Sequence, residues 1–483
     1  MENTVSIPSF IQGELNESGN NIYEEFKDEE VKLKLKLFEP TSENLRQIVS
    51  NLRNEIQNSH NRTTKEIIEI LGNVGERWKK SDQYKQCLEL LPTIYNRPRL
   101  TVEGDLKTFE YFLRSDTLNL LINHEFEAYN ILDKWIFDKG IWKRRQPHGL
   151  VFHNLAGNSP MVALSEIVGV LTKNVNLVKT ASDDPLTPEK IAEVIFEEDK
   201  TLGRRLSVVY WKGEVDKKPN ELYSVLFPTD FQESPIDAVT FWGSMYSVTT
   251  GKRIAAKAGI PVIEHGPKYS FDVIIEDQNL PENLYMEIVG RDIIPHEQEA
   301  CNSSRVVFVK PLEKNGGIKI AKGLTDAFEK NQEMNPKKNE EFEYKKTMSL
   351  RFSYFPDKLE GKADVLVPRG GKVYWTVVYL NQERKLQRAD LDACMRRFII
   401  VKEVGNEDEI IDFIKENNLK KYIQRVGIYG TEHARTRLAD QLTLYGADSI
   451  TYTGMLSIKM PGETHDGFYN LPKFTRLCTM VER

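Results

Sequence analysis

The four cysteines are the first residues to consider, because a thiolate is both a strong nucleophile and a good leaving group. They lie far apart in the chain, as Cys87, Cys301, Cys394 and Cys478, and none belongs to a CxxC pair. This spacing argues against a zinc ribbon or a disulfide scaffold and fits a reducing compartment. A lone cysteine can still hold a substrate covalently, as thioester chemistry requires. The segments around each cysteine must decide which one does so.

Several well-known catalytic signatures are missing from the chain. It contains no GxGxxG after an apolar run, no GxxxxGK[ST], no GxSxG and no HExxH. The run from His296 to Ala300 begins like a zinc-protease motif, but alanine stands where the second histidine ligand must lie on the same helical face. We therefore expect no metal site.

The segment from Gly149 to Pro160 predicts a strand that ends in a tight turn and passes directly into a helix. An apolar run is followed by Ala-Gly-Asn-Ser-Pro. Either Asn158 or Ser159 could cap the helix, and Pro160 suits its first turn. The histidine within the strand, His153, is expected to pack in the core rather than to act in catalysis.

This segment resembles the part of the aldehyde dehydrogenase superfamily that carries the catalytic asparagine, here Asn158. Further segments resemble the superfamily in the same order along the chain, namely Val178–Thr187, Phe241–Ser244, Glu264–Lys268 and Gln298–Cys301. Within the superfamily the chain is most similar to the long-chain fatty-acyl-CoA reductases of bacterial bioluminescence, which convert acyl thioesters to aldehydes. The resemblance is clearest between Gly149 and Val309. The segment His465–Tyr469 also resembles these reductases, but no role for it follows.

The resemblance implies three catalytic residues. Cys301 is the nucleophile that takes the acyl group, while the Asn158 side-chain amide and the backbone N–H of Cys301 stabilise the oxyanion. Glu264 resembles the general base of the superfamily. It would either activate Cys301 or line the pocket and orient Lys268 or the nicotinamide. The other three cysteines lack such surroundings, so a structural role is expected for them.

The resemblance also implies a nicotinamide cofactor. Lys179 and Ser182 would contact the adenosine ribose, and Gly243 and Ser244 would approach the pyrophosphate at a helix start. Relatives that prefer NAD usually carry a glutamate at the place of Ser182. Its absence removes repulsion against a 2′-phosphate, with which Lys179 could pair, so we expect NADPH. Further candidates for pairing with this phosphate are Arg204, Arg205 and Lys212.

The leading interpretation is NADPH-dependent reduction of a long-chain acyl thioester to the aldehyde through an acyl-Cys301 intermediate. Acyl-CoA or an acylated protein would supply the acyl group, an acyl-activating synthetase or an acyl carrier is a further possible partner, and the resemblance implies a homo-oligomer. One alternative is an NAD(P)-dependent aldehyde dehydrogenase that makes acids or acyl-CoA. Glu264 favours this alternative, whereas the Ala-Gly-Asn-Ser-Pro and Gly-Pro-Lys variants count against it. Another is a non-catalytic scaffold that binds a partner synthetase.

Alternating strands and helices must position these residues. From Gly149 onward, short apolar runs alternate with helical patterns of about 10–15 residues, which predicts right-handed βαβ units and parallel sheets. The predicted strands are Leu150–Leu155, Val175–Lys179, Leu206–Trp211, Ala238–Trp242, Pro261–Glu264, Ser270–Ile275, Arg305–Val309, Lys372–Val378, Phe398–Val401 and Gln424–Tyr429.

The expected fold is α/β and similar to that of aldehyde dehydrogenases. We predict a mostly helical N-terminal part over residues 1–140, with one of its helices at Thr117–Lys139. A Rossmann-like cofactor domain over 141–268 and a catalytic domain over 269–445 follow, and residues 446–483 form a C-terminal oligomerisation segment.

Composition limits the classes of function. The chain has 483 residues, of which 40% are hydrophobic and 10% aromatic, which excludes global disorder. Its formal net charge is −6, with no basic region, so nucleic acid is not an expected ligand. The start lacks the pattern of a secretory signal, and no apolar run approaches the roughly 18 residues of a membrane span. We expect a cytoplasmic protein without stable membrane insertion.

Overall fold

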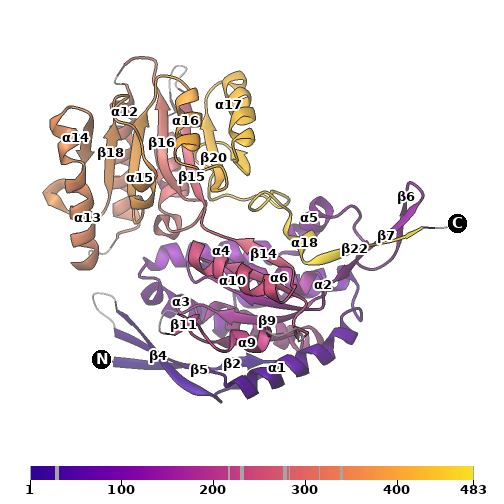
Figure 1. Cartoon of the computed structure of the whole chain (residues 1–483). Coiled ribbons are helices and arrows are strands. Elements are labelled where there is room, and N and C mark those ends of the chain that lie inside the picture. Colours follow the sequence, from indigo (N-terminus) through magenta and orange to yellow (C-terminus); the bar gives the residue numbers. More distant parts are fainter. Residues whose placement is uncertain are drawn as a thin grey trace. The chain divides into compact units, whose positions relative to one another are not determined.

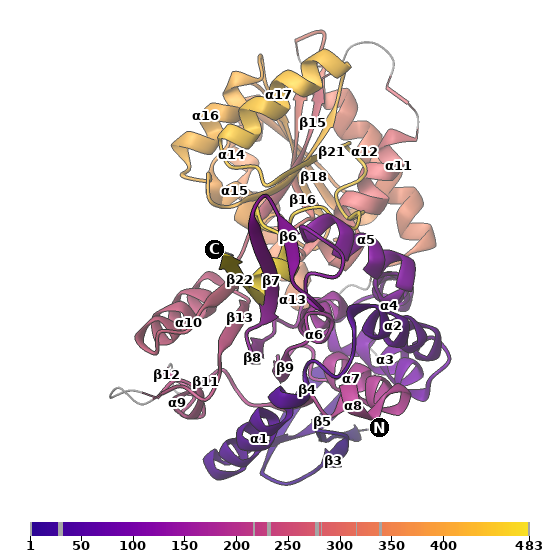
Figure 2. The ribbon, with the colours of Figure 1, turned by 90° about the vertical axis from the view of Figure 1, so that its right-hand side faces the viewer.

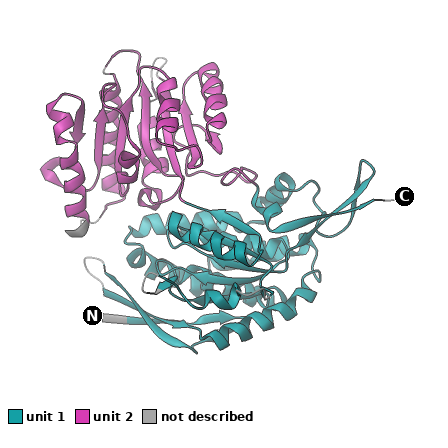
Figure 3. Ribbon diagram, in the orientation of Figure 1, with its two compact units in different colours: residues 1–266, 469–483 teal, residues 267–468 magenta. Residues whose placement is uncertain are grey.

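The computed structural model describes residues 2–27, 32–215, 218–228, 233–275, 280–281, 283–314, 316–337 and 341–481. The chain divides into two compact units (Figures 1 and 3). Unit 1 comprises Met1–Gly266 and Tyr469–Arg483, and unit 2 comprises Pro267–Phe468. Each unit is built on a seven-stranded sheet with helices on its faces, which confirms the predicted α/β class. Within the described ranges, no helix has the length and apolar character that crossing a membrane would need.

The main sheet of unit 1 has the strand order β14-β13-β8-β9-β10-β2-β3. Its first five strands run parallel, and β2 and β3 continue it in antiparallel fashion. The bounds are β2 Ser9–Ile11, β3 Glu14–Asn16, β8 Leu150–Asn154, β9 Val175–Thr180, β10 Leu206–Tyr210, β13 Ala238–Trp242 and β14 Val262–His265. The five parallel strands confirm the predicted series to within one or two residues at each end.

Helices cover both faces of this sheet because consecutive strand residues point to opposite sides. On β10, Val208 packs into the core under α2, α3, α4 and α7, whereas Val209 packs into the core on the other face with α1, α9 and α10. The helices of unit 1 are α1 Ser42–Glu55, α2 Thr64–Trp78, α3 Asp82–Ile94, α4 Arg99–Leu113, α5 Ser115–Glu125, α6 Leu164–Leu171, α7 Thr187–Glu198, α8 Lys200–Gly203, α9 Tyr223–Leu226, α10 Met245–Lys257 and α18 Asn470–Lys473.

The N-terminal residues form strands that the sequence analysis did not predict. A second sheet has the order β1-β5-β4, in which β1 and β5 are parallel and β4 and β5 antiparallel. The bounds are β1 Glu2–Ile7, β4 Asn20–Lys27 and β5 Lys32–Glu39. Two carboxylates of this sheet, those of Glu24 and Glu39, contact residues at the carboxyl end of β10.

A third, antiparallel sheet has the order β22-β7-β6. Its strands are β6 Ile136–Asp138, β7 Ile141–Pro147 and β22 Thr475–Val481, and two short strands, β11 Glu214–Val215 and β12 Lys218–Pro219, pair elsewhere in unit 1. The predicted helix Thr117–Lys139 is wrong in its second half. Helix α5 ends at Glu125, because the residues up to Lys134 form turns and those after it pair in β6.

The sheet of unit 2 has the order β17-β18-β19-β16-β15-β20-β21, with only β17 antiparallel to its neighbour. The bounds are β15 Tyr269–Ile275, β16 Ser304–Lys310, β17 Ala363–Leu366, β18 Thr376–Leu380, β19 Phe398–Glu403, β20 Ile423–Tyr429 and β21 Ser449–Thr451. The five predicted strands of this series are confirmed, although β18 begins later than predicted.

The helices of unit 2 also lie on two faces, and Figure 2 shows α16 and α17 on the side opposite α12. The alternation along β16 explains this arrangement, since Phe308 packs with α16 whereas Val309 packs with α12. The helices are α11 Leu284–Glu287, α12 Gly317–Met334, α13 Glu341–Ser353, α14 Phe355–Leu359, α15 Arg388–Ala393, α16 Asp408–Glu416 and α17 Glu432–Leu444.

Candidate functional site

The carboxyl edge of the unit 1 sheet is the natural place for a dinucleotide. From β8 the chain continues to β9 on one side, and later returns to β13 on the other, so the strand order reverses between β8 and β13. Open α/β sheets bind ligands in the crevice at such a switch point, outside the carboxyl ends of the strands. The predicted site residues of unit 1 all lie at or beyond these ends, namely Asn158, Lys179, Ser182, Gly243, Ser244 and Glu264.

The turn after β8 brings Asn158 to this edge. A Cβ on Gly157 would lie 2.7 Å from the backbone nitrogen of Asp184, so only glycine lets the turn pack against the loop after β9. Ser159 is the residue that caps the following helical turn, accepting a hydrogen bond from the Met161 N–H at 3.2 Å. Asn158 is half-buried, and its amide has no hydrogen-bond partner among the described residues. The amide is therefore not used as a helix cap.

Gly243 and Ser244 form the start of α10. Gly243 has φ 148°, in the region that favours glycine, and the Ser244 hydroxyl caps the helix by accepting from the Ser247 N–H at 3.3 Å. The first turn is exposed and contains no acidic residue. An exposed helix N-terminus without acidic side chains suits a pyrophosphate, so these residues fit a dinucleotide.

Lys179 is a buried cation at the end of β9. Its Nζ donates to the Thr180 carbonyl at 3.1 Å and lies 5.6 Å from the centre of the Trp211 ring. Burial lowers the pKa of Lys179 to about 8, and the Glu39 carboxylate opposes this shift. A nearby anion would stabilise the charged form further, as a 2′-phosphate could.

Ser182 lies in a hydrogen-bond chain that sequence reasoning missed. Its Oγ is 3.0 Å from the Tyr210 hydroxyl, and this hydroxyl donates to Oε1 of Glu24 at 2.7 Å. Glu24 also pairs with Lys212, whose Nζ is 3.3 Å from Oε1. No sequence signal connects β4 to this edge, because the contact depends on how the N-terminal sheet packs.

The three further basic candidates for pairing with a 2′-phosphate lie at different edges of the sheet. Arg204 and Arg205 precede β10 and thus lie at the opposite, amino edge of the sheet. The Arg205 guanidinium is buried there and donates to the carbonyls of Asn58 and Ser59. Only Lys212, which follows β10, lies at the carboxyl edge.

Glu264 is exposed near the end of β14. Its carboxylate forms an ion pair with Lys252 on α10, with Nζ and Oε2 2.5 Å apart. The next residue, His265, is buried and stacks on Trp242 with ring centres 3.7 Å apart. The alternation of a strand therefore turns the two side chains of this motif to opposite faces.

His153 is a core residue, as predicted. Its Nδ1 lies 2.9 Å from the Ser165 hydroxyl, and its Nε2 lies 3.0 Å from Oδ1 of Asn176. Complete burial lowers the pKa of His153 to about 4, so the ring is neutral. Both ring nitrogens are occupied by these structural contacts.

Cys301 lies in unit 2, just before β16. The residue as a whole is partly exposed, the Lys268 N–H donates to the sulfur, and the Cys301 carbonyl accepts from the Ser270 hydroxyl at 2.8 Å. Burial raises the pKa of Cys301, and the Asp466 carboxylate raises it further. The Lys268 N–H and the positive charges of Arg305 and Lys268 act in the opposite direction. Cys87 and Cys394 are fully buried in the two cores, as a structural role requires.

An unusual backbone segment leads to Cys301. His296, Glu297 and Gln298 all have positive φ values, from 49° to 64°. Glu297 and Arg397, each with a side chain 1% exposed, form a two-contact ion pair with distances of 2.6 and 2.9 Å. Gln298 donates to the carbonyls of Ser304 and Phe398 and accepts from the Phe398 N–H. Both oxygens of the Glu297 carboxylate thus accept from Arg397.

The segment His465–Phe468 forms a tight turn in the same unit. Asp466 and Gly467 have φ values of 53° and 82°, and the backbones of His465 and Phe468 are hydrogen-bonded to each other. Asp-Gly is a preferred pair for such a turn. Oδ1 of Asp466 accepts from the Gln424 amide at 2.8 Å. The negative charge of this carboxylate raises the pKa of the Cys301 thiol. No role for this segment was predictable from the sequence.

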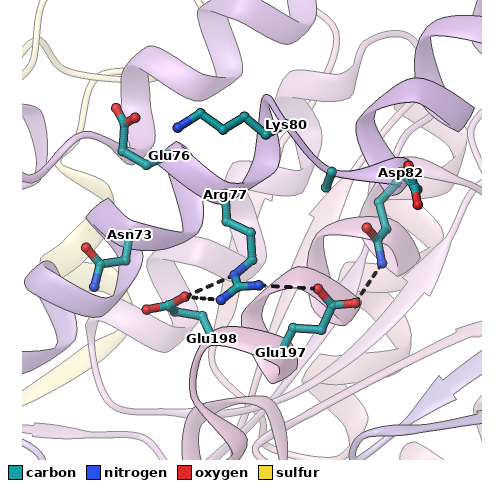
Figure 4. A pocket seen from close by; sticks show the side chains of 9 residues that line it. Asn73, Glu76, Arg77, Lys80, Asp82, Glu197 and Glu198 are labelled. Carbon is teal, nitrogen blue, oxygen red and sulfur yellow. Dashed lines mark hydrogen bonds and ion pairs between the residues drawn. The ribbon is translucent and has the colours of Figure 1, made fainter.

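A surface hollow between α2, α3 and α7 does not resemble a catalytic site (Figure 4). Arg77 is one of its lining residues and forms ion pairs with Glu198 at 3.0 Å and Glu197 at 3.9 Å, and the Gln83 amide donates to Glu197. The remaining lining residues are Asn73, Glu76, Lys80, Ser81, Asp82. Four acidic and two basic side chains line the hollow, and the acidic ones pair with Arg77 or with the adjacent Lys79 and Lys85. The lining contains no cysteine or histidine.

Comparisons with known proteins identify the family. A family model described as acyl-CoA reductase (LuxC) matches residues 59–477. The long-chain acyl-protein thioester reductase of Aliivibrio fischeri is 25% identical, with 98% of this chain and 92% of that protein covered. That of Photorhabdus luminescens is 26% identical, with 89% and 83% covered.

Solved structures show the same fold. The aldehyde dehydrogenase KauB from Pseudomonas aeruginosa has a TM-score of 0.75 at 14% identity, with 98% of this chain and 96% of that chain covered. The NADP-dependent glyceraldehyde-3-phosphate dehydrogenase from Bacillus halodurans, complexed with NADP, has a TM-score of 0.71 at 17% identity and 99% coverage of both chains. The expected aldehyde-dehydrogenase-like fold is confirmed. Because the family model matches most of the sequence, this chain belongs to the acyl-CoA reductase (LuxC) family.

Proposed function

We propose that this protein reduces the acyl group of a long-chain thioester to the aldehyde, through a covalent acyl-Cys301 intermediate and with NADPH as reductant. The observation that carries the proposal is the family match across residues 59–477, which includes Cys301. The partly exposed position of Cys301, whose sulfur accepts from the Lys268 N–H, supports its role as the nucleophile.

The proposed reaction has two covalent steps. The Cys301 thiolate attacks the thioester carbonyl carbon, the bond from that carbon to the carrier sulfur breaks, and the carrier leaves as a thiol after taking up a proton. NADPH supplies a hydride for the second step. The acyl carbon accepts this hydride, its bond to the cysteine sulfur breaks, and the aldehyde leaves while Cys301 returns to the thiolate.

Asn158 is the proposed side-chain donor to the oxyanion, together with the backbone N–H of Cys301. The free amide of Asn158 supports this assignment, because Ser159 performs the capping. Glu264 is the third proposed catalytic residue. Its carboxylate forms an ion pair with Lys252 in this structure, so Glu264 can act as a base only after this ion pair breaks.

NADPH is the proposed cofactor, bound by Lys179, Ser182, Gly243 and Ser244. The exposed start of α10 and the glycine conformation at Gly243 support the pyrophosphate position, and the buried Lys179 supports recognition of a phosphate. The acyl donor would be acyl-CoA or an acylated protein. The relatives named long-chain acyl-protein thioester reductase support the second choice. A partner synthetase or carrier protein, a homo-oligomer and a cytoplasmic location complete the proposal.

The first experiment is intact-mass measurement after mixing the protein with tetradecanoyl-CoA, in parallel with Cys301→Ala. We expect the wild type to gain one acyl group, the variant to gain none, and added NADPH to release tetradecanal. A protein that forms no adduct and yields no aldehyde with this or shorter acyl-CoAs, although NADPH binds, would contradict the proposal. Product analysis also separates the alternatives, since an aldehyde dehydrogenase would convert added aldehyde to acid or acyl-CoA and a scaffold would do neither.

A further inference from the structure

We propose that Glu24 on β4 is a positioning residue for cofactor specificity. Glu24 supplies a carboxylate from the N-terminal sheet, whereas the end of β9 has none. Through this carboxylate it determines whether the Ser182 hydroxyl donates or accepts a hydrogen bond at the 2′ position of the adenosine ribose. This inference rests on the proposed nicotinamide cofactor and adds a determinant that the β9 segment does not contain.

Glu24 is connected to Ser182 through a single side chain, that of Tyr210. The Tyr210 hydroxyl stands between the two groups, 2.7 Å from Oε1 of Glu24 and 3.0 Å from Oγ of Ser182. Tyr210 is buried at the end of β10, so its ring cannot turn away without leaving the core. Burial raises the pKa of Tyr210, and the Glu24 carboxylate raises it further, so the hydroxyl keeps its proton.

The direction of the hydrogen bonds follows from counting protons. A carboxylate can only accept, so Tyr210 must give its one proton to Glu24. The Tyr210 oxygen can then only accept from Ser182, and the single proton of the Ser182 hydroxyl is used in that bond. Toward a ligand, Ser182 therefore offers lone pairs and no donor.

This direction has a consequence for the choice of cofactor. In βαβ dinucleotide sites an acidic residue at the end of the second strand accepts a hydrogen bond from the ribose 2′-hydroxyl. Ser182 lies at the end of β9, which is that second strand, and as an acceptor it can serve the same hydroxyl. A 2′-phosphate needs donors instead. Lys179 favours the cofactor that carries a 2′-phosphate. Glu24 limits this preference, so the cofactor with a free 2′-hydroxyl can also bind.

A second carboxylate of the N-terminal sheet does not share this role. Oε1 of Glu39 accepts from the Lys212 N–H at 3.3 Å and from the Asn220 amide at 3.0 Å, and neither bond involves Tyr210 or Ser182. Lys212 pairs with Glu24, so its charge at this edge is partly neutralised. Removal of Glu24 frees both Ser182 and Lys212 to donate to a phosphate.

The test uses the full chain and two unreactive fragments of the cofactor, 2′,5′-ADP and 5′-AMP, with dissociation constants measured by calorimetry. The variants are Glu24→Met, which removes the acceptor, and Tyr210→Phe, which removes the connecting hydroxyl. The matched control is Glu25→Gln, the neighbour on β4 whose exposed carboxylate pairs with Lys34. We expect both variants to raise the preference for 2′,5′-ADP over 5′-AMP by about fivefold to tenfold, as one hydrogen bond would, with no change in the control.

The ratio of the two constants separates specificity from structure, because damage to the site weakens both fragments alike. The ratio of the steady-state rates with the two nicotinamide cofactors should move in the same direction.

If the wild type binds both fragments and neither variant changes the ratio of their dissociation constants, the role of Glu24 is wrong. If the wild type binds neither fragment, the proposed cofactor site is itself wrong, and the inference falls with it. Should Glu24→Met fail to fold, Tyr210→Phe decides alone.

Discussion

Cys301 is held as a thiol rather than as a ready thiolate. Burial and the Asp466 carboxylate both raise its pKa, and the Lys268 N–H and the nearby positive charges only partly oppose them. Acyl transfer requires a thiolate, whereas the raised pKa keeps most of this proposed nucleophile protonated near neutral pH. Such a group reacts little with adventitious electrophiles. Its activation must then come with the substrate or with a change in the charges around it.

This arrangement predicts how Cys301 responds to pH and to Asp466. Because its pKa is raised, the thiolate fraction should grow about tenfold between pH 7 and pH 8. Asp466→Asn removes the negative charge, which lowers the pKa and should raise the rate of alkylation by iodoacetamide at pH 7 several-fold. Peptide mass spectrometry at Cys301 measures the rate, and the partly exposed Cys478 of the same protein is the internal reference. A rate at Cys301 that is already maximal at pH 7, or that Asp466→Asn leaves unchanged, would contradict this account.

The cofactor edge shows how far single residues could be predicted. Lys179, Ser182, Gly243 and Ser244 follow strands that the sequence marks clearly, so their placement at one edge of the sheet was predictable. The contact of Ser182 with Tyr210 and Glu24 was not. It joins three elements through side chains, and no local pattern encodes such a contact. The cofactor specificity that we propose for Ser182 would therefore depend on contacts that the strand-end segment alone does not encode.

At the scale of elements, predictability follows hydrophobic pattern. The buried parallel strands are near-continuous apolar runs between helical patterns, and these are strong signals. The N-terminal strands were missed although β5 reads Lys-Leu-Lys-Leu-Lys-Leu, with Leu33, Leu35 and Leu37 buried. That alternation is the period-two pattern of a half-buried strand and could have been used. The predicted helix failed beyond Glu125 partly because Ile136–Asp138 pair with β7, a strand contact that the helical pattern does not show.

The segment before Cys301 gives a prediction at the element scale. Three consecutive residues with positive φ are costly for non-glycine side chains, and the buried pair of Glu297 with Arg397 holds them in place. Glu297→Gln leaves the buried guanidinium without its counter-charge, which should cost about 3–5 kcal/mol in the free energy of unfolding. Acylation of Cys301 should also slow, because the segment that positions it is released.

The matched control for this prediction is Glu299→Gln, two residues further along. Glu299 pairs with Arg396 at 2.7 Å, but both side chains retain a fifth or more of their exposure, so the loss should be below about 1 kcal/mol. Urea unfolding and the rate of acyl-adduct formation measure the two effects. Equal destabilisation by both substitutions would show that the buried pair has no special role.

At the scale of the whole molecule, two units with separate cores can respond differently to conditions. Unit 2 contains a buried acid pair, Asp272 and Asp292. Asp292 accepts from the N–H groups of Gly454 and Leu456 at 2.5 and 2.6 Å, and Asp272 lies buried beside it on β15. Burial raises the pKa of Asp272 to about 7, and burial together with the Asp272 charge raises that of Asp292. Two carboxyl groups so placed cannot both be ionised without cost, so one keeps a proton.

The sign of the resulting pH dependence follows from the raised pKa. The folded unit binds a proton that the unfolded chain releases near pH 4, so stability is full below that value and falls as the pH rises to about 7, by up to about 1.4 kcal/mol per pH unit. Asp272→Asn removes the titrating group and leaves an amide that can donate to Asp292. The variant should therefore lose less stability than the wild type between pH 5 and pH 8 in urea unfolding of unit 2. Asp412→Asn, on the exposed face of α16, is the control and should follow the wild type. An Asp272→Asn variant with the same slope as the wild type would show that the pair does not titrate in this range, and that the loop at Gly454–Leu456 is held without a shared proton.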